Sequence, residues 1–156
     1  MKNIFFYDTK IGRIAIMDNG KEITYMEVSD NTNLKDLNVC ETELIKEAAR
    51  QLNEYLNGSR TQFQLPLNPQ GTEFQKKVWN ALCNIPYGET RSYKQVAEAI
   101  GNPKASRAIG MANNKNPIMI FIPCHRVIGS NGKLVGYAGG LDMKEKLLQI
   151  ENNHAV

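Results

Sequence analysis

The sequence predicts an α+β protein of two small domains, residues 1–69 and 70–156. Three observations predict this fold class. Strand-like segments with a hairpin signal come first, one amphipathic helix follows, and helical patterns dominate the remainder. A chain of 156 residues is long enough for one or two such cores. We therefore expect a small antiparallel sheet with a helix, followed by a mostly helical domain with a helix-turn-helix.

The first domain begins with segments whose composition is typical of strands. They cover residues 3–8, 11–17 and 22–28. An Asp-Asn-Gly tripeptide at residues 18–20 joins the last two and predicts a hairpin, because Asn and Gly tolerate positive φ. Residues 41–57 repeat apolar side chains at helical spacing before Gly58, which predicts a helix. Residues 63–67 are compatible with an edge strand.

A junction, Asn-Pro-Gln-Gly at residues 68–71, precedes the second domain. Thr72 and Gln75 form a capping-box pattern that predicts the start of a helix. Its apolar stripe includes Trp79, which we interpret as a core residue. The next helix is predicted over residues 93–100 after Ser92.

A Gly-Asn-Pro turn leads into another helix, at about residues 104–113, and the two helices form a helix-turn-helix pattern. Small side chains dominate the second of them, which suits either close approach to a partner or tight core packing. An apolar, β-branched run at 118–122 predicts a buried strand or extended segment that ends in Pro123-Cys124. A final helix is predicted over residues 141–152.

Charge is distributed unevenly. Residues 1–69 carry 8 basic and 10 acidic side chains, whereas residues 70–156 carry 11 basic and 6 acidic ones. The window 91–133 has seven basic residues and one acid, Glu98. This imbalance is compatible with a polyanionic partner, although a solvated lysine surface is the more ordinary interpretation of charge alone.

The three cysteines, Cys40, Cys83 and Cys124, form no CxxC pair, so we expect neither a metal site nor a disulfide framework. No apolar stretch is long enough to cross a bilayer, and we expect a cytoplasmic protein. Cys124 stands beside His125 and Arg126, and a neighbouring base or cation makes a thiol more reactive. An isolated Cys-His pair is nevertheless more often structural.

The string around this cysteine, Ile-Pro-Cys-His-Arg-Val at residues 122–127, resembles the active-site signature of the O6-alkylguanine-DNA alkyltransferases. The resemblance extends over residues 70–152 in motif, order and spacing. It includes the strings at 71–75, 85–90, 92–93, 101–110, 116–117, 136–141 and 144–151. Residues 1–69 match in pattern alone, and there the family has a ribonuclease-H-like domain.

The resemblance implies a DNA repair protein that rotates O6-alkylguanine out of duplex DNA and transfers the alkyl group irreversibly to its own Cys124. It implies O4-alkylthymine as a second substrate and one turnover per molecule. The implied partner is double-stranded DNA, bound through the minor groove without regard to sequence. The resemblance implies no cofactor, and we expect a monomer.

The resemblance also implies catalytic roles. Cys124 is the alkyl acceptor, and His125 takes its proton through a bound water. Glu151 orients His125, and Asn116 holds the turn that positions the site. Tyr93 crowds the target phosphate, assists rotation of the nucleotide and donates a proton to the departing guanine.

Arg107 is implied to enter the base stack in place of the extruded nucleotide. The DNA-binding residues implied in addition are Ser92, Tyr93, Lys104, Ala105, Ser106 and Arg126. The base pocket is implied to comprise Met119, Val127, Val135, Tyr137 and Ala138. Residues 1–69 contain Cys40 and no histidine, so we expect no structural zinc of the kind that some relatives hold there.

Two departures concern the pocket. Ala138 stands where some relatives have serine, and Met119 stands where some have proline. We expect methyl transfer to survive these changes, while the fit of bulky groups such as benzyl is in doubt.

Three other functions compete with this interpretation. Lesion sensors of the same family lack the acceptor cysteine, which is present here. A Cys-His hydrolase needs an oxyanion hole that the sequence does not reveal. A damage-responsive transcription factor needs an additional metal-binding domain, for which 156 residues leave no room.

Overall fold

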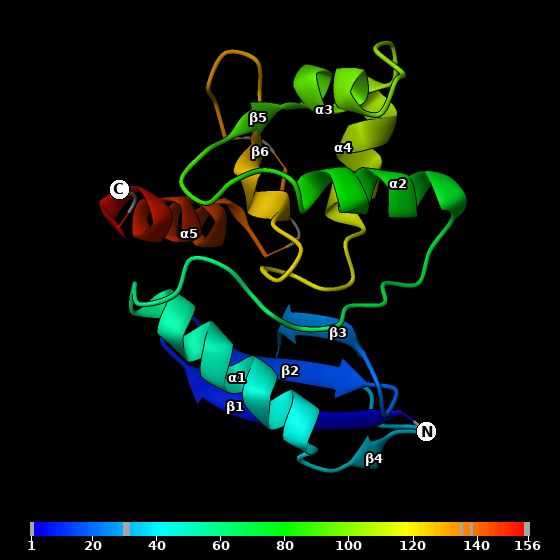
Figure 1. The fold of residues 1–156 in the computed structure, drawn as a ribbon, viewed down its shortest axis with the longest axis vertical. Coiled ribbons are helices and arrows are strands. Elements are labelled where there is room, and N and C mark those ends of the chain that lie inside the picture. The colour runs from blue at the N-terminus through cyan, green and yellow to red at the C-terminus, as the bar shows by residue number, and fades with distance from the viewer. Residues whose placement is uncertain (1, 30–31, 135, 138, 155–156) are drawn as a thin grey trace. The chain divides into compact units, whose positions relative to one another are not determined.

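The protein divides into two compact units (Figure 1). The structure is a computed structural model, and it describes residues 2–29, 32–134, 136–137 and 139–154. The first unit comprises Met1–Gln70 together with Pro117–Met119. The second comprises Gly71–Asn116 and Ile120–Val156. Three residues in the middle of the second half of the chain therefore belong to the first unit.

The first unit contains a four-stranded sheet in the order β3-β2-β1-β4. Its strands are β1 (Asn3–Thr9), β2 (Gly12–Asp18), β3 (Ile23–Val28) and β4 (Asn38–Val39). The three long strands pair antiparallel as predicted, but β4 runs parallel to β1, so the sheet is mixed rather than antiparallel. Two residues are too few to show strand periodicity, and the sequence gives no signal for β4. Residues 63–67 contribute a single bridge, Ile23 to Leu67, instead of an edge strand.

A buried carboxylate, Asp18, ties the sheet to helix α1 (Glu43–Leu56). Asp18 accepts hydrogen bonds from the Asn3 side chain at 2.8 Å and from the Thr42 hydroxyl at 2.5 Å. Thr42 is the N-cap of α1, and its hydroxyl accepts from the backbone N–H of Ile45. The hairpin predicted between β2 and β3 is confirmed, with Gly20 at φ 93°. Asp18 also accepts from the N–H of Gly20 at 3.2 Å, so one side chain contacts both the hairpin turn and the start of the helix.

The second unit is mostly helical, as predicted. Its elements are α2 (Glu73–Leu82), β5 (Arg91–Ser92), α3 (Tyr93–Ala99), α4 (Ser106–Asn114), a 3-10 turn (Cys124–Arg126), β6 (Val127–Ile128) and α5 (Leu141–His154). Helix α2 begins with the predicted capping box, and α3 begins at the predicted cap, Ser92, which also forms a capping box with Gln95. The strands β5 and β6 pair in parallel and join the residue that caps α3 to the segment after Cys124. None of the helices in the described ranges is long and apolar enough to cross a membrane.

Trp79 is a core residue, as the sequence predicts. Its ring is 1% exposed, and its indole N–H donates to the carbonyl of Ala112 at 2.8 Å. This bond joins α2 to the inner face of α4, where Ile109 and Asn113 are also buried. The helices α3 and α4 follow each other across a turn and form the predicted helix-turn-helix pair (Figure 1).

The apolar run at 118–122 is buried as predicted, but of the two predicted alternatives, a strand or an extended segment, it does not form the strand. Met26 of β3 donates to the carbonyl of Pro117 and accepts from the N–H of Met119, which makes one isolated bridge. Ile120 then has φ 71°, a conformation that branched side chains rarely adopt. This residue turns the chain back into the second unit. The apolar character of the run therefore reflects burial and not a ladder of backbone hydrogen bonds.

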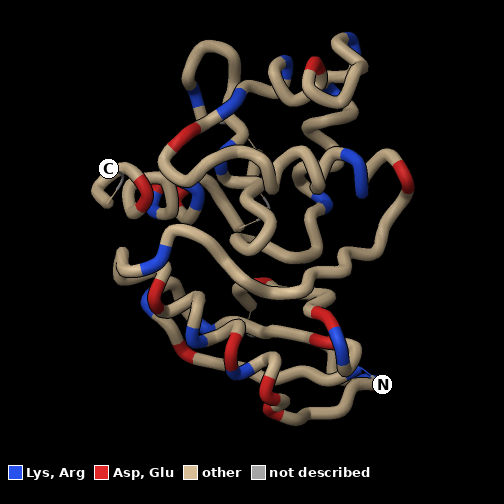
Figure 2. Tube along the Cα trace, in the orientation of Figure 1, with Lys and Arg blue, Asp and Glu red and all other residues tan. Residues whose placement is uncertain are grey.

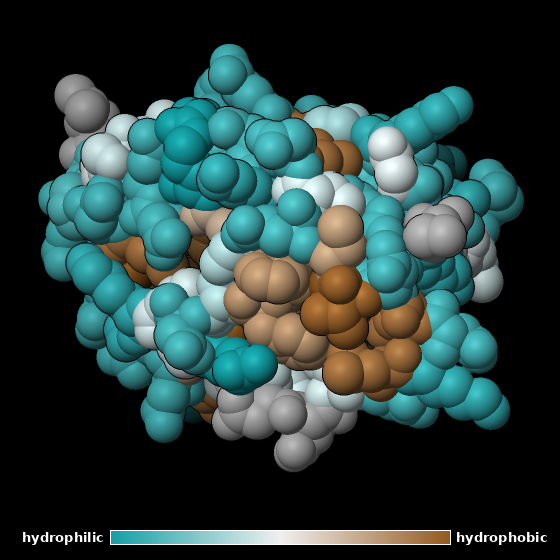
Figure 3. Space-filling model, turned by 90° about the horizontal axis from the view of Figure 1, so that it is seen from below, coloured by the Kyte–Doolittle hydropathy of each residue, from teal (hydrophilic) through white to brown (hydrophobic). Residues whose placement is uncertain are grey.

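Most of the large apolar side chains are buried, and four of those in the described ranges are exposed: Leu34, Val39, Met111 and Leu141. Figure 3 shows apolar side chains gathered on one face of the protein within a polar surround. Leu34 and Val39 belong to the first unit, whereas Met111 and Leu141 belong to the second.

Candidate active site

Cys124 begins a single 3-10 turn and is 2% exposed. The N–H of Arg126 donates to the carbonyl of Pro123 at 3.0 Å and closes this turn. The sequence prediction of a cysteine at the end of a strand is therefore wrong in its backbone geometry. On this turn the neighbours Cys124 and His125 are both buried, whereas on a strand their side chains would point to opposite faces.

Two asparagine side chains fix the backbone around the cysteine. Asn116 donates to the carbonyl of Ile122 at 2.9 Å, and Asn113 donates to the carbonyl of Cys124 at 3.2 Å. Both side chains are buried. Asn116 was singled out by the sequence resemblance, whereas Asn113 was missed, because nothing in the α4 pattern separates a buried asparagine from an exposed one. The two bonds thus fix the backbone just before the turn, at Ile122, and at its first residue, Cys124.

His125 and Glu151 form a fully buried pair. The His125 Nε2 atom lies 2.6 Å from a carboxylate oxygen of Glu151. The same carboxylate accepts two hydrogen bonds from Arg126, at 2.8 and 3.0 Å, and one from the N–H of Gly88 at 3.1 Å. The fourfold contact leaves Glu151 little freedom to rotate, which fixes the orientation of the imidazole ring.

Arg126 is a member of this buried network and does not face a DNA surface. It is 7% exposed, and its remaining guanidinium nitrogen donates to the carbonyl of Ile85 at 2.7 Å. Its Cζ atom also lies 5.8 Å from the centre of the Tyr87 ring. The implied DNA-binding role of Arg126 is corrected accordingly, because its guanidinium is directed to Glu151 and Ile85.

Burial controls the ionisation of the site. It raises the pKa of Cys124, while Asn116, the charge of Lys144 and the hydroxyl of Tyr137 act in the opposite direction. Burial also lowers the pKa of His125, against the influence of Glu151. At neutral pH the resting thiol is therefore protonated and the imidazole is neutral, so His125 is available as a base.

Two further charged groups of the site, Glu151 and Lys144, have shifted pKa values. Burial alone would raise the pKa of Glu151, but the hydrogen bonds and charges of His125 and Arg126 outweigh it and hold the pKa at about 2. Burial lowers the pKa of Lys144 to about 8, against the opposing influence of Cys124. Lys144 is thus still charged at pH 7, close to the boundary at which it loses its proton.

The buried face of α5 supplies both charged groups. Lys144, Leu147 and Glu151 are spaced by three and four residues and are buried on one side of the helix. The sequence analysis used Lys144 only as part of a matching string and missed its place beside the thiol. Its spacing from Leu147 and Glu151 indicates that the three residues share a face of the helix, but the burial of that lysine depends on how α5 packs.

The other residues of the site lie on several elements. Tyr137 and Val127 are buried in the second unit, and Tyr93 is the first residue of α3. Met119 is buried in the first unit, and so is separate from the unit that holds Cys124. Val135 and Ala138, both expected in the base pocket, lie outside the described residues. The structure therefore brings together part of the expected pocket.

The helix-turn-helix pair carries the remaining residues expected to bind DNA. Arg107 and Lys104 are exposed, Ala105 is the N-cap of α4, and the Ser92 hydroxyl caps α3. A shallow depression of about 300 Å³ lies between these helices, lined by Tyr93, Lys94, Ser106, Arg107, Gly110 and Ser130. Figure 2 shows basic positions along α3 and the turn before α4, and the one acid between residues 91 and 133 is Glu98.

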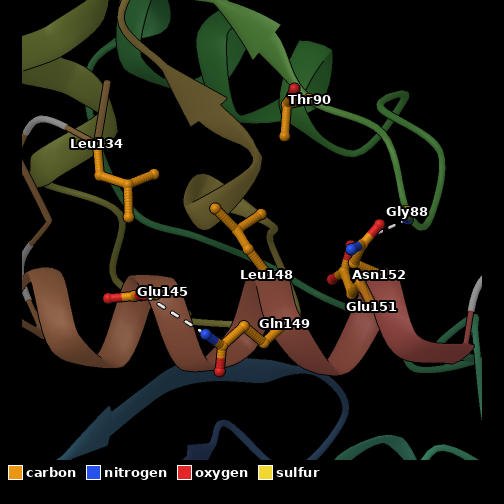
Figure 4. Close-up of a pocket in the computed structure, with 8 residues that line it drawn as sticks. All are labelled: Gly88, Thr90, Leu134, Glu145, Leu148, Gln149, Glu151 and Asn152. Atoms are coloured by element: carbon orange, nitrogen blue, oxygen red, sulfur yellow. Dashed lines mark hydrogen bonds between the residues drawn. The ribbon is translucent and has the colours of Figure 1, made fainter. Parts of the chain in front are cut away.

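A separate pocket of about 370 Å³ lies between α5 and the segment that leads into β5 (Figure 4). Its lining residues are Gly88, Thr90, Leu134, Glu145, Leu148, Gln149, Glu151 and Asn152. Cys124 is not among these lining residues. Among the described residues, no three His, Cys, Asp or Glu side chains form a group that could hold a metal ion.

Fold and site together define a two-unit α+β protein in which a buried cysteine and a His–Glu pair share one unit with a helix-turn-helix. Residues 5–69 match the ribonuclease-like domain, and residues 73–153 the DNA-binding domain, of 6-O-methylguanine DNA methyltransferase. The chain belongs to the 6-O-methylguanine DNA methyltransferase family, and it is a DNA-binding methyltransferase of DNA repair.

Similar proteins cover nearly the whole chain. The methylated-DNA–protein-cysteine methyltransferase of Methanosarcina acetivorans is 51% identical over 94% of this chain and 96% of its own length. Its counterpart in Mycobacterium leprae is 44% identical over 96% and 92%. The crystal structure of Mycobacterium tuberculosis OGT in complex with DNA has a TM-score of 0.92 at 42% identity, covering 98% of this chain and 94% of that one. These likenesses confirm the predicted family and fold class.

Proposed function

We propose that this protein repairs DNA by moving the alkyl group of O6-alkylguanine onto the sulfur of its own Cys124. One observation carries the proposal. Within the unit that matches the family's DNA-binding domain, a buried thiol shares a tight turn with His125, which lies 2.6 Å from Glu151. A nucleophile, a base and a group that orients the base are the parts needed to activate a thiol.

The geometry supports the following order of steps. Neutral His125 takes the thiol proton through a bound water, and Glu151 stabilises the resulting imidazolium. Lys144 and the Tyr137 hydroxyl stabilise the thiolate. Sulfur then bonds to the alkyl carbon while the bond from that carbon to O6 breaks, and the guanine takes a proton from Tyr93. A thioether is a poor leaving group, so each molecule acts once.

The burial of Cys124 supports extrusion of the nucleotide. The O6 position is on the edge of a paired and stacked base, so a thiol that is 2% exposed within the protein cannot reach it without base flipping, at a cost of a few kcal/mol. We propose that α4 enters the minor groove and that Arg107 fills the vacated stack. Tyr93 crowds the phosphate, while Ser92, Lys104, Ala105 and Ser106 contact the backbone without reading sequence.

We propose Val127 and Tyr137 as walls of the base pocket, together with Met119 and with Val135 and Ala138. A methyl group is the substrate we expect it to accept best, with O4-alkylthymine as a second lesion. We further propose that the protein acts as a monomer in the cytoplasm and without a cofactor.

The proposal is tested by the intact mass of the protein after incubation with a duplex that contains O6-methylguanine. Wild type is expected to gain one methyl group, located on the Cys124 peptide, and Cys124→Ala is expected to gain none. Cys40→Ala is the matched control, because Cys40 lies in the first unit, and it should gain the methyl group normally. Tight lesion binding without a mass change would indicate a lesion sensor. If the protein shows neither a mass change nor lesion binding, the cysteine hydrolase becomes the leading hypothesis again.

Lys144→Met is expected to slow the alkylation of Cys124 by iodoacetamide at pH 7 by about three- to tenfold, because a buried cation favours the thiolate. The pKa of Lys144 is about 8, so wild type loses this charge above that pH and the difference between the proteins should narrow there. The rate of loss of the thiol, followed from pH 6 to about 10, measures the effect.

The control is Lys146→Met, which removes an exposed lysine from the same helix. Equal alkylation rates for the Lys144 and Lys146 variants across the whole pH range would show that Lys144 does not act on the thiol.

A further inference from the structure

We propose that Met111 is a second minor-groove contact of α4, placed one helical turn after Arg107 and packed against the deoxyribose walls of the groove. The inference rests on the proposed function and adds to it a residue that the sequence analysis did not single out. It concerns the affinity for duplex DNA and leaves the chemistry at Cys124 unchanged.

The first support is the position of Met111 on the helix. Ile109, Ala112 and Asn113 form the buried face of α4. Arg107 and Met111 are four residues apart and both exposed, so they lie one above the other on the opposite face. A partner that meets Arg107 along this helix therefore also meets Met111.

The second support is the contrast between Met111 and its surroundings. The exposed residues next to it on α4 are Arg107, Ala108 and Asn114, which are polar or small, while Met111 is 70% exposed. A single exposed apolar side chain is ordinary on a protein surface. On a helix face whose other exposed side chains are polar or small, however, Met111 is the large apolar group that an approaching surface touches.

The third support is the chemistry of the groove. The rims of the groove are phosphates. Three exposed lysines around the same helix pair, Lys94, Lys104 and Lys115, are available to bind them. The walls of the groove are sugar rings that offer carbon and hydrogen atoms to an apolar side chain, and methionine is among the residues that proteins place in the minor groove. The flexible, polarizable thioether of methionine adapts to such a wall without depending on the base sequence.

The test is the affinity of each protein for a lesion-free duplex, measured by fluorescence anisotropy over a range of salt concentrations. Met111→Ala is expected to bind about fivefold more weakly, as partial loss of one methionine contact implies. The slope against salt should not change, because no charge is removed. Met111→Leu is expected to retain most of the affinity.

Two controls separate groove contact from general damage. Val39→Ala removes an exposed apolar side chain from the first unit and should leave the affinity unchanged. Alkylation of Cys124 by iodoacetamide and the thermal midpoint of unfolding should be equal in wild type and Met111→Ala.

Duplex affinities within twofold of wild type for Met111→Ala would overturn the proposal. So would a parallel loss of thiol reactivity or thermal stability, which would make Met111 a structural residue. Concentration-dependent association that Met111→Ala abolishes would assign the side chain to a contact between copies instead. Failure of wild type to take up a methyl group would count against the proposed function and is distinguishable from all three results.

Discussion

His125→Gln is expected to slow methyl transfer from an O6-methylguanine duplex to Cys124 by about two to four orders of magnitude, the usual contribution of a general base. Glutamine can still bond to Glu151 from this buried position, but it cannot accept the thiol proton. Single-turnover transfer, followed by the mass of the protein at successive times, measures the rate. A loss smaller than tenfold would mean that another group deprotonates Cys124.

The pH profile gives an independent check of the same residue. Burial lowers the pKa of His125 below its ordinary value, so wild type should keep its neutral base somewhat below pH 6.5 and lose activity only in more acidic solution. The His125→Gln profile should lack that acid limb. His154→Gln is the matched control, because His154 is the other histidine of the chain, is exposed near the end of α5, and should leave rate and profile unchanged.

Arg126→Met is expected to lower the free energy of unfolding by about 3–5 kcal/mol, the usual result of removing one partner from a buried ion pair. The change removes two hydrogen bonds from Glu151 and one from the carbonyl of Ile85, and it leaves a buried carboxylate with His125 and Gly88 as its partners. Urea unfolding of both proteins at pH 7 measures the difference.

The same variant should change the response to acid. In wild type the pKa of Glu151 is about 2, below its ordinary 4.5, so its stabilising contribution is complete above pH 4.5 and is lost as the pH falls toward 2. Without Arg126 the pKa of Glu151 rises, and the loss should begin at a higher pH.

Arg91→Met is the control for this prediction, because it breaks an exposed pair with Glu89 and should cost less than about 1 kcal/mol. If the Arg126 variant is as stable as the Arg91 variant, the buried network does not contribute to folding as described.

The parts of the fold that could be predicted from sequence are those determined by neighbouring residues. The capping boxes at Thr72 and Ser92 and the hairpin at Gly20 each depend on a few consecutive side chains, and all three are present. The parallel strand β4 could not be predicted, because its two residues pair with a strand 35 positions earlier. Ile120 misled the strand prediction, since its backbone is set by the crossing between the units and not by its own preference.

The site divides in the same way. Cys124, His125 and Glu151 followed from the resemblance, and the structure places His125 and Glu151 in contact. The pairing of Arg126 with Glu151 spans 25 positions, so local sequence patterns do not reveal that this arginine is part of a buried network. The burial of Lys144 depends on how α5 packs, which the spacing of its apolar residues alone does not determine.

The three residues Pro117–Met119 make the two units inseparable along the chain. They bond to Met26 inside the first unit, yet they stand between Asn116 and the turn of Cys124 in the second. A fragment that starts at Gly71 would keep these residues but lose β3, to which they bond. The backbone between Asn116 and Cys124 would then lack its hydrogen bonds to Met26. Exchange of the first unit for an unrelated one would therefore also disturb the backbone that leads to Cys124.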